Sequence, residues 1–170
     1  MSLRKLTILA LFTTLSLAIF AIESTIPPLI PLPGIKLGLA NIITLVLLQH
    51  YSAKDAFWVL IARILLSSFL FGQVLSLFYS LAGGGLSFSI MFISNRLLFK
   101  KMPFLTGALG GLFHNLGQLL TAFAVTASAG VFTYSPYLAV SGILTGLFTG
   151  LCAHFAERWL LPHLDRFSDQ

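Results

Sequence analysis

Apolar stretches separated by short breaks make up almost the whole chain. Because a transmembrane helix needs roughly 20 mostly apolar residues, this pattern predicts membrane-spanning helices. We expect about six of them, at about 6–23, 36–51, 56–80, 86–99, 103–128 and 136–160. The second and fourth are short, so we expect each either to be only slightly tilted or to lie partly inside the bundle.

The breaks carry prolines, glycines or charged residues, which are typical of turns. The longest runs from Glu23 to Asn41 and is otherwise mostly Ile and Leu, unlike a water-exposed loop. We place the next helix from Gly34, which puts Lys36 in its first turn. A cation there opposes the helix macrodipole, and an anion, either Glu23 or a bound ligand, would relieve it. The other breaks are expected at Tyr51–Asp55, Gly83–Gly85, Lys100–Pro103 and Ala129–Pro136.

Composition supports an all-α integral membrane protein. The 170 residues are 57% hydrophobic and only 9% charged, whereas soluble domains carry about a quarter charged residues. Six helices leave little length for loops, so we expect one transmembrane domain over residues 1–170 and no separate soluble catalytic domain. The predicted fold is a compact bundle of about six transmembrane helices.

The distribution of Lys and Arg predicts the orientation of the bundle, because cytoplasmic loops carry an excess of both. With six helices, Lys36 alone lies on the side opposite the termini. We therefore expect both termini in the cytoplasm, an inner or plasma membrane location, and the proline-rich segment outside. The basic residues predicted on the side of the termini are Arg4, Lys5, Lys54, Lys100, Lys101, Arg158 and Arg166.

The sequence gives little support for catalysis. The five acidic residues form no close pair within a predicted helix, so the carboxylates that hold Mg²⁺ in phosphoryl chemistry are missing. P-loop, H-E-x-x-H and G-x-S-x-G motifs are also missing. Cys152 is the only cysteine, which excludes an internal disulfide or a cysteine-cluster metal site. We predict no enzyme, cofactor or metal, and no nucleic acid as partner, since the net charge of +5 is spread along the chain.

Small residues recur at four-residue spacing on three predicted helices, which lets helix backbones approach closely. Gly107 and Gly111 form one such ridge, and a second follows on the last helix. We expect the glycines to pack helices within the bundle. For the first helix, packing and docking of a partner membrane protein are equally open. Its small residues are Ala10, Thr14 and Ala18, and the last helix has Gly142, Gly146 and Gly150.

Several polar side chains fall at matching depth in the outer half of the predicted bundle, where such groups are costly. They could line a pocket that opens to the outside beneath the proline-rich segment, or they could only hydrogen-bond one another. Arg63, in the inner half, is expected to snorkel to the interface or to pair with backbone carbonyls. The candidate substrate-binding residues are Glu23, Lys36, Asn41, Gln73, His114, Asn115 and Gln118.

The segment P-G-I-K-L-G-L-A-N-I-I-T-L, which follows a helix ending in Glu and a proline-rich loop, resembles the Gx transporter family. Members are often labelled heptaprenyl diphosphate synthase component I, and the family is similar to the substrate-binding S components of energy-coupling factor (ECF) transporters. The H-N-x-x-G-Q pattern of the fifth helix, ending at Gln118, belongs to the same likeness. The resemblance covers essentially the whole chain in length and hydropathy.

This resemblance implies a six-helix bundle that binds a small molecule from outside, such as a vitamin, flavin or isoprenoid-related compound. It implies a transmembrane coupling subunit and two cytoplasmic ATPases as partners. In S components an A-x-x-x-A face on the first helix meets the coupling subunit, and here Thr14 stands between Ala10 and Ala18. The synthase label implies at most an accessory, because the chain has no D-D-x-x-D motif. The alternative function is thus a non-catalytic membrane accessory in isoprenoid or quinone biosynthesis, or in membrane electron transfer.

Overall fold

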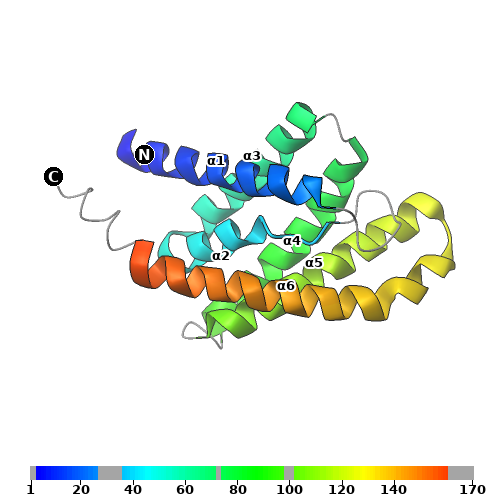
Figure 1. Ribbon diagram of the computed structural model, residues 1–170. Helices are drawn as coiled ribbons and strands as arrows, with labels where there is room; N and C mark the ends of the chain where they lie inside the picture. Colours follow the sequence, from blue (N-terminus) through cyan, green and yellow to red (C-terminus); the bar gives the residue numbers. More distant parts are fainter. Residues whose placement is uncertain (1–2, 27–35, 72–73, 98–101, 161–170) are drawn as a thin grey trace.

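The protein is a bundle of six α-helices, seen in a computed structural model that describes residues 3–26, 36–71, 74–97 and 102–160 (Figure 1). No strand occurs in these ranges, which confirms the predicted all-α class. One 3₁₀ helix and one π-helical turn, η1 and η2, flank the last helix. The elements are α1 (Leu3–Thr25), α2 (Asn41–His50), α3 (Ala53–Phe71), α4 (Val74–Leu97), α5 (Pro103–Thr126), η1 (Ala129–Tyr134), α6 (Ser135–Phe155) and η2 (Ala156–Leu160).

Four helical stretches are long and apolar enough to cross a membrane: α1, α4, α5 and the stretch that contains α6. Many large apolar side chains face outward on them and on α3, as expected for contact with lipid rather than water. Trp58 and Phe69 on α3 are examples. The helix α3 has similar length but carries two charged residues at its start and Arg63 midway along it. These features support an integral membrane protein.

The boundary between the third and fourth helices differs from the prediction. A break was expected at Gly83–Gly85, but these residues lie within α4, which runs from Val74 to Leu97. The prediction was wrong because glycine marks close helix contact in an apolar helix as well as a turn. A methyl group on Gly83 would lie 2.9 Å from the His114 carbonyl oxygen of α5, and one on Gly84 would lie 3.3 Å from Ile64 of α3. The two glycines therefore let α4 fit between α3 and α5.

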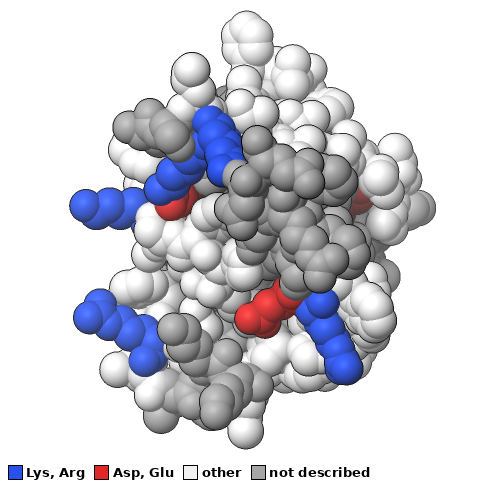
Figure 2. All heavy atoms as spheres, turned by 90° about the vertical axis from the view of Figure 1, so that its left-hand side faces the viewer, with Lys and Arg blue, Asp and Glu red and all other residues white. Residues whose placement is uncertain are grey.

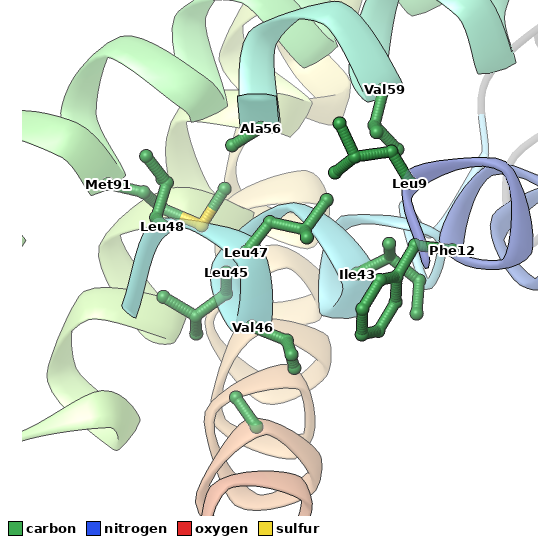
Figure 3. Close-up of a cluster of buried hydrophobic side chains, with 11 residues drawn as sticks. Leu9, Phe12, Ile43, Leu45, Val46, Leu47, Leu48, Ala56, Val59 and Met91 are labelled. Carbon is green, nitrogen blue, oxygen red and sulfur yellow. The ribbon is translucent and has the colours of Figure 1, made fainter. Parts of the chain in front are cut away.

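The short helix α2 forms the centre of the bundle. This confirms one of the two predictions for the second helix, that it lies partly inside the bundle. It packs against each of the other five α-helices, and seven of its ten residues are buried. Figure 3 shows its side chains at the middle of the main apolar core, with Phe12 of α1, Val59 of α3 and Met91 of α4 around them. A helix that is apolar all round is stable only when it is buried in this way. The fourth helix is not short, since α4 has 24 residues.

Contacts between helix ends show the relative direction of three helix pairs: α1 with α3 and α2 with α4 are parallel, and α5 with α6 is antiparallel. Lys5 near the start of α1 forms an ion pair with Asp55 in the first turn of α3 (2.8 Å). Asn95 near the end of α4 donates to the Leu48 carbonyl near the end of α2 (3.0 Å). The ring of Phe104 at the start of α5 lies 5.6 Å from that of His154 at the end of α6. Figure 2 views the bundle from the end that carries the N-terminus, and Lys and Arg side chains are spread around it.

The start of α3 also has a local capping arrangement. The Ser52 hydroxyl accepts the Asp55 backbone N–H (3.2 Å), and the Asp55 carboxylate accepts the Ser52 N–H (3.3 Å) and hydroxyl (2.6 Å). This reciprocal bonding satisfies donors at a helix start that would otherwise lack partners. It also fixes the carboxylate that Lys5 meets, and so joins the starts of α1 and α3.

The two glycine ridges face each other, which confirms the prediction that the glycines pack helices within the bundle. A methyl group on Gly111 would collide with the Gly142 carbonyl oxygen, and one on Gly107 would collide with that of Gly146. Gly150 lies against the backbone of Phe104 at the start of α5. The helices α5 and α6 therefore touch backbone to backbone along most of their length, which gives them the most extensive contact in the bundle.

We expect Gly111→Ala to destabilise the protein by about 1–3 kcal/mol, because its methyl group has no space against α6. Gly85→Ala is the matched control, since Gly85 is exposed and has no neighbouring atom within 4 Å of an added methyl. The control should keep or raise stability. The measurement is the midpoint of unfolding for both variants in one detergent, and equal midpoints would contradict the proposed α5–α6 contact.

Candidate functional site

The carboxylate of Glu23, near the end of α1, holds the segment that enters α2. It accepts the backbone N–H of Gly38 (2.7 Å) and of Leu39 (2.9 Å), and its side chain is buried. Residues 36–40 are not an α-helix, so these N–H groups have no helical partner. Bonds from N–H groups to a carboxylate are about twice as strong as neutral ones. Glu23 therefore fixes the position of this connecting segment 36–40.

Gly38 is required at the point where the connecting segment turns. Its φ of +82° lies in the left-handed region, which side chains other than glycine rarely adopt. An added methyl group would also lie 2.6 Å from Cδ2 of His114. The Gly38 carbonyl then accepts the Asn41 N–H (3.0 Å), and α2 begins there. The predicted helix start at Gly34 was wrong, because residues 36–40 are not helical and α2 begins only after the turn at Gly38.

Two side chains of α5 continue the network one turn apart. Gln118 Oε1 accepts the Lys36 backbone N–H (3.2 Å), and Gln118 Nε2 lies 3.0 Å from Nε2 of His114. Because the amide nitrogen donates, the His114 Nε2 accepts, and the ring proton then lies on Nδ1 beside the Gly83 backbone. Both side chains are buried. The site thus joins α1, the connecting segment, α4 and α5.

Lys36 lies outside both α1 and α2, so the expected conflict with the α2 macrodipole does not arise. Its ammonium donates to the Ser24 hydroxyl (2.9 Å) and lies 3.6 Å from the centre of the Phe20 ring. Burial lowers the pKa of Lys36 to about 8, although the Glu23 carboxylate acts in the opposite direction. The side chain is a half-buried cation held beside α1.

The remaining candidate residues divide into two groups. Asn41 belongs to the cluster, because its amide donates to the Ser87 hydroxyl of α4 (3.3 Å) and lies beside Gly38. Asn115 faces α6 instead, where its amide donates to the Leu138 carbonyl (2.8 Å) and the Ser141 hydroxyl (3.1 Å). Gln73 lies outside the described residues. The structure therefore brings together Glu23, Lys36, Asn41, His114 and Gln118.

Arg63 joins this cluster from α3, which the sequence did not indicate. Its side chain is only 4% exposed, so the expectation that it snorkels to the interface was wrong. Its charge interacts with those of Glu23 and Lys36. The predicted helix at 56–80 put Arg63 in its inner half, whereas α3 runs from Ala53 to Phe71 and has Arg63 midway. Correct bounds for the third helix would have indicated that Arg63 lies at its middle.

The small residues of the first helix lie outside the cluster. Ala10, Thr14 and Ala18 are all exposed, and the Thr14 hydroxyl donates to the Ala10 carbonyl of its own helix (3.0 Å). This exposure contradicts the interpretation that the face packs within the described bundle. Docking of a partner membrane protein stays a prediction.

The chemistry of the cluster is suited to binding a small molecule. No group of three or more His, Cys, Asp or Glu in the described ranges could hold a metal ion. The cluster consists of hydrogen-bond donors and acceptors, two cations, and a carboxylate that is already bonded to two N–H groups. Such a set can recognise polar groups of a small molecule in an apolar surrounding.

Comparison with known proteins gives one match. The family model described as heptaprenyl diphosphate synthase component I matches residues 12–156. This range takes in most of α1 and all of α2 to α6, and so every residue of the cluster. No curated protein and no solved structure matches the chain.

We expect Glu23→Gln to loosen the connecting segment, because a neutral amide is a weaker acceptor for the Gly38 and Leu39 N–H groups. Amide hydrogen exchange at these two positions should accelerate about tenfold or more. Glu157→Gln, at an exposed position in η2, is the control and should leave both amides unchanged. Unchanged exchange in Glu23→Gln would show that other contacts hold the segment.

Proposed function

The chain belongs to the heptaprenyl diphosphate synthase component I family, and we propose that it is a membrane-embedded substrate-binding subunit for uptake of a small metabolite. The observation that carries this proposal is the convergence of buried polar side chains from α1, α3, α4, α5 and the connecting segment. Buried polar groups in a membrane protein are costly, so they mark substrate sites more often than scaffolding.

The connecting segment supports a binding role because it is held mainly by side chains. Gly38 and Leu39 bond to Glu23, and the Lys36 N–H bonds to Gln118. A ligand that offers its own donors and acceptors can exchange with these bonds at little net cost, since each is worth about 0.5–3 kcal/mol net. The proposed contacts are Glu23, Lys36, Asn41, Gln73, His114, Asn115 and Gln118. The candidate ligands are vitamins, flavins and isoprenoid precursors.

Uptake needs an energy source, and the sequence contains no nucleotide-binding motif. In the proposed function, partner subunits supply it: a membrane coupling subunit and two cytoplasmic ATPases, as in ECF transporters. The exposed face of Ala10, Thr14 and Ala18 is the proposed contact with the coupling subunit. Small residues there would let a partner helix approach the α1 backbone closely.

The second candidate is a non-catalytic accessory subunit, which the family's description favours. Its partner would be a catalytic prenyl diphosphate synthase, or a protein of quinone synthesis or membrane electron transfer. Affinity purification of the full chain from its native membrane distinguishes the two. Co-purification of ATPases supports the uptake subunit, whereas co-purification of a soluble prenyltransferase or a redox protein without ATPases supports the accessory.

Binding by the purified protein tests the proposed site. We expect mass spectrometry to find a co-purified small molecule, and its affinity to fall about tenfold or more in Gln118→Leu and in Lys36→Ala. Ser89→Leu is the control, because Ser89 is exposed on α4 and bonds only to the Gly85 carbonyl of its own helix. Unchanged affinity in both site variants would refute the site, as would an equal loss in the control.

A further inference from the structure

Arg63 is a buried cation whose hydrogen-bonding capacity is largely unused. Its side chain is 4% exposed, and neither Nε nor Nη2 has a hydrogen-bond partner in the part of the chain that the structure describes. It forms no ion pair within 4.0 Å there. An isolated buried charge costs several kcal/mol, so such a group is normally paired.

Within the described ranges Arg63 has no spare carboxylate. Of the three acidic residues there, Glu23 is the one whose charge interacts with the guanidinium, and its oxygens already accept two backbone N–H groups. Asp55 is bonded to Lys5 and Ser52, and Glu157 is exposed in η2. The segments 27–35 and 72–73 contain no acidic residue. With Lys36 nearby, the site holds two cations against one carboxylate.

The surroundings of the guanidinium offer it little compensation. Gly84 of α4 lies beside it, with Nη2 3.9 Å from the position of an added methyl group. Leu60 and Ile64 reach the same glycine from α3 with their terminal methyl groups. A low-dielectric setting of this kind strengthens any charge–charge interaction that forms in it.

We propose that Arg63 binds an oxyanion group, a carboxylate or a phosphate, of the molecule that the protein takes up. The planar guanidinium presents paired donors that match the two oxygens of such a group. Lys36 supplies a second positive charge toward the same anion, while His114 and Gln118 offer polar contacts to the rest of the molecule. This inference rests on the proposed binding function and adds the chemical class of the ligand: a small anion.

The same chemistry could come from a lipid, because phosphatidylglycerol carries an anionic phosphate. The two sources are separated by using the full-length protein in nanodiscs of phosphatidylcholine alone and in nanodiscs that also contain phosphatidylglycerol. The soluble probes are benzoate, phenyl phosphate and the neutral benzamide, which share one ring and differ in charge. The readouts are the midpoint of thermal unfolding and the dissociation constant from calorimetry.

We expect benzoate or phenyl phosphate to stabilise the wild-type protein and benzamide to bind about tenfold or more weakly. Arg63→Met should bind benzoate and benzamide alike, whereas Arg63→Lys, which keeps the charge, should retain part of the preference. Without a probe, Arg63→Met should be as stable as the wild type or more so, because it removes an unpaired buried charge. Stabilisation by phosphatidylglycerol alone, lost in Arg63→Met, would support the anion site and identify a lipid as its source.

Three results would overturn the inference: no anion or anionic lipid stabilises the wild type, Arg63→Met keeps the preference for anions, or Arg63→Met strongly destabilises the probe-free protein. The last would assign Arg63 a structural role. The inference and the proposed function fail separately. If a co-purified molecule binds through Gln118 and Lys36 but is indifferent to Arg63→Met, the binding subunit stands and the anion site falls.

Discussion

Backbone that is not helical inside an apolar bundle needs hydrogen-bond partners, because lipid and apolar side chains offer none. The connecting segment 36–40 meets this constraint because its backbone N–H groups donate to side chains of other helices. Glu23 takes the N–H groups of Gly38 and Leu39, and Gln118 takes that of Lys36. The short helix α2 can begin in the bundle interior only because the chain before it is satisfied in this way. Both the central position of α2 and the polar cluster follow from it.

Tight packing and polar recognition are divided between helices in this bundle. The pair α5–α6 is held by facing glycines and is tightly packed, while the charged and polar groups come from α1, α3, α4, α5 and the connecting segment. Helix α5 serves both roles at different points along its length: Gly107 and Gly111 contact α6 in its first half, and His114 and Gln118 contact the cluster farther along. A rigid α5–α6 pair therefore provides a fixed wall for the site.

Much of the fold could be predicted wherever a sequence pattern has a single structural meaning. The glycine ridges and the all-α class followed from spacing and hydropathy, and both are confirmed. The exit from α3 was missed because Gly83–Gly85 looks like a turn, and glycine serves turns and close helix contacts equally. That error shifted the predicted centre of the third helix away from Arg63, so the burial of this residue was not expected. The direction of Asn115 depends on where α6 lies beside α5, which composition does not specify.

Helix α1 carries the Glu23 tether near one end and an exposed face of small residues farther along. From Ala10 to Glu23 the helix rises by roughly 20 Å, at about 1.5 Å per residue, so a rigid rod joins the two regions. Displacing the two N–H groups from the carboxylate would remove one of the links between that end of α1 and the connecting segment. A ligand bound in the interior would thereby change the mobility of the lipid-facing side of α1. A partner protein bound to that side could then respond to the ligand without contacting it.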